Sequence, residues 1–129
     1  MTRDQGLILW QKAEGALICA AALWLYAGAE TVLPLWAAVL VFFAPDLSFL
    51  AYVLGKRVGS VCYNLVHVYA LGVVTLVVGH LWGAPLWFEI GALWLAHSGF
   101  DRMLGYGLKS VQDFEITHLG PIGKRRAGH

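Results

Sequence analysis

The chain has 129 residues, of which 59% are apolar and only 13% are charged. A soluble domain usually carries about 25% charged residues, so this composition argues against an ordinary soluble protein and favours a single membrane domain. The formal net charge is only +1, and no basic patch interleaved with aromatic residues indicates a nucleic-acid partner.

Four long apolar stretches predict an all-α fold, a bundle of four transmembrane helices in one domain of residues 1–129. Each stretch has about 20 residues, which at about 1.5 Å rise per residue spans a hydrocarbon core of about 30 Å. The spans are residues 7–27, 34–54, 58–79 and 85–103, and a short tail of residues 104–129 follows. We expect the first stretch to be a span and not a cleaved leader, because Asp4 and Glu14 are unusual in a signal peptide.

The nine Lys and Arg residues predict the orientation of these spans. All of them lie before or within the first turns of span one, between spans two and three, or from the end of span four onward. The connections 28–33 and 80–84 carry neither Lys nor Arg. Since basic residues concentrate on the cytoplasmic side, both termini and the tail are predicted to be cytoplasmic.

In the first two spans, two carboxylates lie toward the cytoplasmic side. Glu14 lies early in span one, and Asp46 follows Pro45 late in span two. Proline cannot donate a hydrogen bond to the carbonyl four residues before it, so Pro45 should kink or break the helix. Asp46 is either part of a site beside this kink or the cap of a helix that restarts there, and both roles are compatible.

In the last two spans, further polar residues lie at the same depth. Asn64 and His67 are three residues apart in span three, and His97 and Asp101 are four residues apart in span four. Each pair therefore lies on one face of its helix. Ionisable groups within a membrane usually face the bundle interior and mark a functional site, although Asn and His also serve as plain hydrogen-bonding contacts between helices.

The tail contains a weak capping-box pattern at residues 110–113, which predicts a short surface helix. Phe114, Ile116, Leu119 and Ile122 are too apolar for a solvated tail, which favours a lid folded over the cytoplasmic mouth. Cys19 and Cys62 lack metal-ligand spacing and are interpreted as small apolar residues within spans.

Several segments together resemble a known family. They are Ala44–Ser48, Tyr63–His67, Ala96–Arg102, Gly105–Lys109 and Thr117–Gly120. The combination is similar to an uncharacterised family of small bacterial membrane proteins, domain-of-unknown-function family 4260, over most of the chain. The resemblance implies a small multi-pass protein of a bacterial inner (cytoplasmic) membrane, and it implies no activity.

Three functional hypotheses follow from the polar residues. The first is an acid–base enzyme without a cofactor, of isomerase, cyclase or epoxide-opening type, that acts on a small lipophilic substrate. The second is a membrane enzyme whose histidines and carboxylates hold zinc or iron. The third is a non-enzymatic protein that binds or moves a proton, a cation or a small molecule, or merely fixes helix register. Membrane lipid is the expected environment under all three, and association into a homo-oligomer could enclose a pathway.

The candidate residues divide by role. Asp46 is the predicted acid, His67 and His97 are bases or ligands, Asp101 orients them, and Glu14 is a second carboxylate. The predicted substrate-binding residues, which orient a histidine, line the pocket or belong to the lid, are Asn64, Tyr63, Trp94, Phe100 and His118.

Overall fold

The computed structural model describes residues 3–113 and 115–122, whose regular secondary structure is helical apart from one short hairpin. The elements in order are α1 (Arg3–Gly28), α2 (Leu35–Phe43), the 3-10 helix η1 (Ala44–Leu54), α3 (Lys56–His67), α4 (Tyr69–Leu81), α5 (Pro85–Leu104), β1 (Ile116–Thr117) and β2 (Gly120–Pro121). The predicted all-helical class is confirmed. Some residues used in the predictions for the tail and for the orientation of the spans lie outside the described residues. They are Phe114, Lys124, Arg125, Arg126 and the side chain of Arg3.

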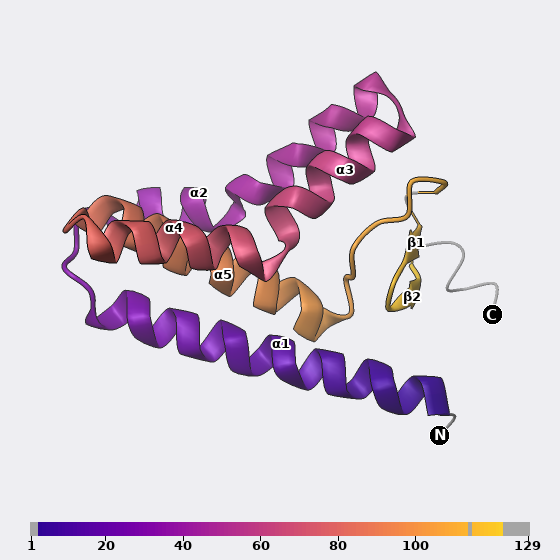
Figure 1. Ribbon diagram of the computed structural model, residues 1–129, viewed down its shortest axis with the longest axis horizontal. Coiled ribbons are helices and arrows are strands. Elements are labelled where there is room, and N and C mark those ends of the chain that lie inside the picture. The colour runs from indigo at the N-terminus through magenta and orange to yellow at the C-terminus, as the bar shows by residue number, and fades with distance from the viewer. Residues whose placement is uncertain (1–2, 114, 123–129) are drawn as a thin grey trace.

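Helix α5 is the central helix and packs between α1 and α4 (Figure 1). Glycines make these contacts close: a Cβ atom at Gly72 of α4 would lie 2.6 Å from the backbone nitrogen of Leu95 in α5. Gly15 of α1 and Gly99 of α5 approach one another in the same way. Small residues at helix crossings are typical of membrane bundles, where close van der Waals packing replaces the hydrophobic effect. The buried cluster at the α1–α5 contact consists of Cys19, Ala22 and Ala96.

Two helical stretches, Asp4–Gly28 and Leu35–Leu54, are long and apolar enough to cross a membrane. A third is added if Lys56–His67 and Tyr69–Leu81 form one span bent by 46°. Large apolar side chains on these helices are widely exposed, which fits contact with lipid. The described residues therefore contain two to three candidate spans, whereas the sequence predicted four. The fourth, α5, has the predicted length but carries three charged residues, Glu89, Asp101 and Arg102, and is largely enclosed by other helices.

The break in the second predicted span lies at Pro45, as expected. Pro45 has no N–H for the carbonyl of Val41, and the chain continues as the tighter helix η1 instead of ending. The Val41 carbonyl accepts hydrogen bonds from the N–H of Ala44 and from the indole N–H of Trp94, the latter at 3.1 Å. Trp94 thus ties the broken helix to α5.

The third predicted span, 58–79, is also broken, and here the prediction of one continuous helix is wrong. Val68 has extended backbone angles (φ −76°, ψ 147°) and separates α3 from α4. The break frees the carbonyl of His67, which accepts a hydrogen bond from Arg102 Nη2 of α5 at 2.9 Å. A buried arginine therefore satisfies the backbone group that would otherwise lack a partner. His67 consequently ends α3 directly beside α5.

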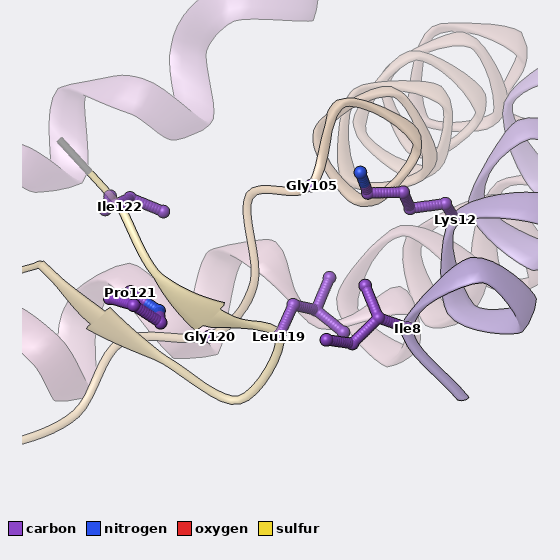
Figure 2. A pocket seen from close by; sticks show the side chains of 7 residues that line it. All are labelled: Ile8, Lys12, Gly105, Leu119, Gly120, Pro121 and Ile122. Carbon is purple, nitrogen blue, oxygen red and sulfur yellow. The ribbon is translucent and has the colours of Figure 1, made fainter. Parts of the chain in front are cut away.

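The tail folds back toward the helices, but the short surface helix predicted to follow the capping pattern at 110–113 is not found among the described residues of the tail. Ser110 Oγ instead accepts the N–H of Gln112, and strands β1 and β2 then pair antiparallel. Asn64 of α3 fastens the tail, because its amide accepts the N–H of Lys109 at 2.7 Å and donates to the carbonyl of Lys109 at 2.9 Å. Between the hairpin and α1 lies a cavity of about 420 Å³ (Figure 2), with Lys12 and Leu119 on its wall.

At the opposite end of α5, a buried carboxylate holds the connection between α1 and α2. Glu89 is 1% exposed, and its two carboxylate oxygens accept the N–H groups of Val32 and Leu33, each at 3.0 Å. Glu89 therefore serves the backbone of this connection and makes no contact with the polar residues at the other end.

Candidate metal centre

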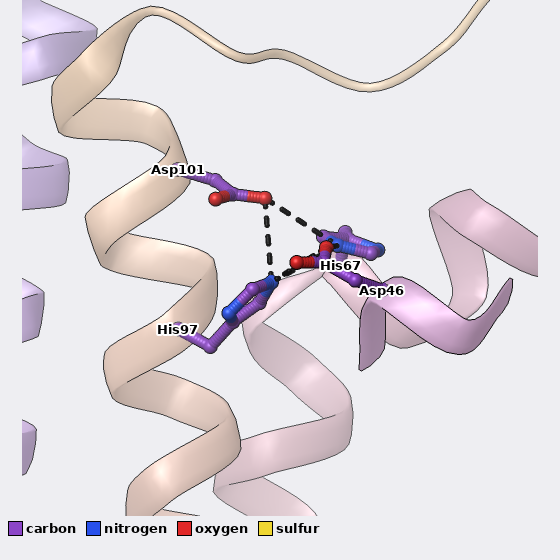
Figure 3. Close-up of side chains that lie close together, drawn as sticks. All are labelled: Asp46, His67, His97 and Asp101. Atoms are coloured by element: carbon purple, nitrogen blue, oxygen red, sulfur yellow. Dashed lines mark hydrogen bonds and ion pairs between the residues drawn. The ribbon is translucent and has the colours of Figure 1, made fainter. Parts of the chain in front are cut away.

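Four side chains from three segments meet where both broken helices approach α5. Asp46 lies in the first turn of η1 directly after Pro45, and His67 is the last residue of α3. His97 and Asp101 lie one turn apart on α5. Figure 3 shows the four side chains pointing toward one another. The two helix breaks therefore bring Asp46 and His67 to residues that α5 already presents on one face.

The contacts within this cluster are short and centre on four atoms. Asp46 Oδ1 lies 3.2 Å from Nε2 of His67 and 3.2 Å from Nε2 of His97. Asp101 Oδ2 lies 3.4 Å from each of the same two nitrogens. The two Nε2 atoms are 3.2 Å apart, and all four atoms lie within 4.8 Å of one another. Each carboxylate oxygen thus bridges both histidines.

The hydrogen bond at the far side of the His67 ring determines what this histidine presents to the cluster. Nδ1 of His67 lies 2.8 Å from the carbonyl oxygen of Tyr63. A carbonyl only accepts, so Nδ1 carries the proton, and in the neutral ring Nε2 presents its lone pair to the cluster. Nδ1 of His97 has no hydrogen-bond partner among the described residues.

The histidines are buried behind the carboxylates. His67 and His97 are 0% and 1% exposed, whereas the side chains of Asp46 and Asp101 are 39% and 12% exposed. The ring of Tyr63 stacks on His67 with centroids 3.7 Å apart, and Phe42 meets the His97 ring edge-on at 5.2 Å. Aromatic packing therefore fixes both imidazoles while the carboxylates face the more open side.

A cavity of about 290 Å³ lies on this open side. Its lining consists of Asp46, Phe49, Tyr63, Asp101, Tyr106, Lys109 and Ile122. Lys109 is 4% exposed, and its Nζ atom lies 5.2 Å from the centroid of the Tyr63 ring. Burial lowers the pKa of Lys109 to about 8, and the negative charge of Asp101 opposes this shift. The cavity wall therefore carries both acidic and basic side chains.

Most distances between the four ligand atoms match those that a tetrahedral metal site requires. Zinc binds histidine nitrogens and carboxylate oxygens at about 2.0–2.2 Å, and a regular tetrahedron of such bonds has edges of about 3.3–3.6 Å. Five of the six distances between the ligand atoms are 3.2–3.4 Å. The sixth, between Asp46 Oδ1 and Asp101 Oδ2, is no more than 4.8 Å. Imidazole and carboxylate ligands suit zinc or iron. Asp46, His67, His97 and Asp101 could hold such an ion through one atom each.

The predicted residues that reach this centre are Asp46, His67, His97, Asp101 and Tyr63. Tyr63 lines the cavity, and its hydroxyl donates to Asp101 Oδ2 at 3.5 Å. The alternative role of Asp46 as a plain helix cap is not observed, because no side-chain cap bond is present at the start of η1. Spacing and predicted depth were sufficient to identify these residues.

Two predictions about charged and polar groups near the centre are wrong. Glu14 is exposed on α1 and contacts Gln11 at 3.5 Å, so it is not a second carboxylate of the cluster. The next residue, Gly15, occupies the contact with α5 instead. Asn64 does not orient either histidine, since both ends of its amide bind the backbone of Lys109.

Three predicted pocket residues also lie elsewhere. Trp94 lines a separate cavity of about 300 Å³ beside Pro45. Phe100 packs against the α1–α5 core and meets Phe42 with ring centroids 5.9 Å apart. His118 is exposed, and its Nδ1 accepts the N–H of Leu108 at 2.8 Å. These side chains contribute to packing and to the fold of the tail.

Sequence reasoning missed two cationic residues at the site, Lys109 and Arg102. Arg102 was expected to reach the headgroups or a carboxylate, but it is 4% exposed and donates to the carbonyls of His67 and Tyr106. Lys109 was counted only as a marker of orientation, yet it lines the cavity. The available signal for Lys109 was its place in the segment Gly105–Lys109, which carries the family resemblance.

Comparison with known proteins identifies one family. The family model described as "Domain of unknown function (DUF4260)" matches residues 8–122, which is most of the chain. The matched range includes all four residues of the cluster and the described part of the tail up to Ile122. No curated protein and no solved structure matches the sequence.

Proposed function

Because the chain belongs to domain-of-unknown-function family 4260, whose description names no activity, we propose a function from the site itself: a metal-dependent membrane enzyme. In this proposal Asp46, His67, His97 and Asp101 bind one zinc or iron ion. When bound, the ion would take a water as a further, fifth ligand and lower its pKa, which would supply a nucleophile or base near neutral pH. The cavity on the carboxylate side admits the substrate.

The convergence of four ligand atoms at distances of 3.2–3.4 Å is the observation that carries the proposal. With ionised carboxylates and neutral imidazoles whose Nε2 atoms are unprotonated, all four atoms are acceptors. A proton joins only two heavy atoms, whereas a cation at the centre contacts all four. A divalent ion also balances the two negative charges, which reduces the free-energy penalty of placing carboxylates within a membrane.

The arrangement of the protein in the membrane belongs to the same proposal. We infer four spans in which α5 is the enclosed fourth, both termini in the cytoplasm, and a location in the inner membrane of a bacterium. The positions of the Lys and Arg residues and the exposed apolar faces of α1, α2 and η1 support this arrangement. The metal centre then lies toward the cytoplasmic side, and membrane lipid contacts the outer helices.

Acid–base catalysis without a metal is the second candidate, and the pairing of each histidine with both carboxylates favours it. Nε2 of His67 and of His97 lies within 3.2–3.4 Å of a carboxylate oxygen of Asp46 and of Asp101. Such pairs can move a proton to or from a small lipophilic substrate, as isomerisation or cyclisation requires. The presence or absence of a stoichiometric metal separates the two candidates.

The first experiment is a metal measurement on protein purified in detergent without chelators. We expect about one zinc or iron ion per chain by inductively coupled plasma mass spectrometry, as a site with four ligands binds tightly. His97→Ala and Asp101→Asn should each reduce the metal content strongly. His80→Ala is the matched control, because His80 lies exposed at the other end of α4 and should leave the content unchanged.

Metal-free protein that also fails to take up zinc or iron on titration would exclude the metal centre. Catalysis by the histidine–aspartate pairs would then be the better explanation of the cluster. Equal metal content in wild type and in both variants would show that the bound ion lies elsewhere.

A further inference from the structure

The cavity beside the cluster has an electrostatic character that constrains its ligand. Asp46 and Asp101 form one wall, and Lys109 is the one Lys or Arg among its lining residues that the structure describes. This inference rests on the proposed function: a divalent ion balances the charge of the two carboxylates, and Lys109 adds a further basic group to the lining. The occupied site is then cationic, and its Lys109 is 4% exposed, so the charge is shielded from bulk water. Such a cavity favours an anion over a neutral or cationic ligand.

Two centres of positive charge adjoin the same cavity, because two of the four ligands, Asp46 and Asp101, line it together with Lys109. One is the position enclosed by the four ligand atoms, and the other is Lys109 Nζ, held over the face of the Tyr63 ring. An anion that contacts both needs several oxygen atoms. A phosphate group offers three terminal oxygens and up to two negative charges, whereas a carboxylate offers two oxygens and one charge. The arrangement therefore fits a phosphate group better than a carboxylate.

The surroundings of the cavity indicate that this phosphate is carried by a lipophilic molecule. Phe49 and Ile122 add apolar surface to the lining, and the volume of about 290 Å³ exceeds the space that a phosphate group alone fills. On η1, next to Asp46, the apolar side chains of Leu47 and Leu50 are 66% and 70% exposed. An apolar chain can lie along this face while the polar head enters beside Asp46.

We propose that the cavity between the metal ligands and Lys109 binds a phosphate group, with one oxygen on the ion as a fifth ligand and another on Lys109. The phosphate belongs to a membrane lipid or to a soluble phosphate compound. The exposed apolar face of η1 favours the lipid. Both sources share the same oxyanion chemistry at the site.

The test is equilibrium dialysis of metal-loaded, full-length protein in detergent against radiolabelled inorganic phosphate. Lys109→Gln should lower phosphate affinity by at least about tenfold, because it removes a buried charge-assisted contact. Its metal content should match that of wild type. Lys109→Arg keeps the charge and should retain most of the affinity. Lys12→Gln is the control, since Lys12 lies on the wall of the other cavity.

The source of the phosphate is resolved by competition. Phosphatidic acid in nanodiscs should displace the label at lower total phosphate than dissolved glycerol phosphate does if the ligand is a lipid. Equal potency identifies a soluble phosphate compound. Nanodiscs of phosphatidylcholine alone serve as the reference.

Three results would overturn the proposal: no phosphate binding by metal-loaded wild type, equal affinity in wild type and Lys109→Gln, or equal binding with and without metal. The last comparison uses only the wild-type chain and decides the question even if the neutral variants fail to fold. Metal analysis of the same samples shows whether the phosphate proposal or the proposed metal-dependent function fails. Protein that holds metal but no phosphate contradicts this inference alone, and protein that binds no metal contradicts the proposed function as well.

Discussion

His118 links the hairpin to the segment after α5 through a single hydrogen bond that depends on pH. Its Nδ1 accepts the N–H of Leu108 at 2.8 Å, so the bond requires the neutral ring. Although the His118 side chain is exposed, partial desolvation of its ring and, to a lesser degree, the positive charge of Arg102 lower its pKa below the usual 6.5. The undocked tail therefore binds the proton more readily, and docking is strongest above about pH 6.5 and weakens as the pH falls below it.

Hydrogen exchange provides the measurement for this prediction. The protection factor of the Leu108 amide, corrected for the intrinsic exchange rate, should decrease on acidification below about pH 6.5 in wild type. His118→Ala should show low protection with little pH dependence. Protection that rises on acidification would contradict the assigned role.

For individual residues, the sequence predicted the four members of the cluster better than the residues around them. Asp46, His67, His97 and Asp101 were recognisable because helical spacing and span orientation place them on common faces at similar depth. Glu14 has a similar depth, but it does not lie on the face of α1 that meets α5. That face is defined by small residues such as Gly15. Asn64 lies near His67 in sequence, yet its partner, the backbone of Lys109, lies 45 residues away.

At the scale of helices, the contact between α4 and α5 depends on the absence of side chains. A Cβ atom at Gly91 would overlap the backbone nitrogen of Leu76 in α4. We expect Gly91→Ala to lower the free energy of unfolding by about 1–3 kcal/mol, because the backbones must separate. Chemical unfolding in detergent, followed by circular dichroism, measures the change. Gly6→Ala is the control, since a Cβ there meets nothing within 4 Å; equal midpoints for Gly91→Ala and wild type would contradict the close packing.

The two helix breaks differ in how far the sequence reveals them. Pro45 predicts the first break by its covalent structure alone. The second, at Val68, has no proline or glycine beside it, and it is accompanied by a tertiary contact from Arg102 to the His67 carbonyl. Local pattern predicts a continuous helix there, because the apolar run gives no sign of the distant arginine.

For the whole molecule, the proposed orientation predicts which connections reach each side of the membrane. In spheroplasts, a membrane-impermeant maleimide should label Thr31→Cys, which lies between α1 and α2. Lys56→Cys, at the start of α3, should be labelled only after permeabilisation. The parent chain is the control, since Cys19 is buried and Cys62 is partly buried. Labelling of Lys56→Cys from outside would overturn the predicted topology.

The position of the cluster relative to the large-scale shape has a mechanical consequence. η1 and α3 pack against each other as an arm that projects away from α1, α4 and α5 (Figure 1). Asp46 and His67 lie at the root of this arm, on its first and last turns, whereas His97 and Asp101 belong to the body of the protein. An ion held by all four side chains would cross-link the arm to the body of the protein, and its removal would allow the arm to change its orientation relative to that body.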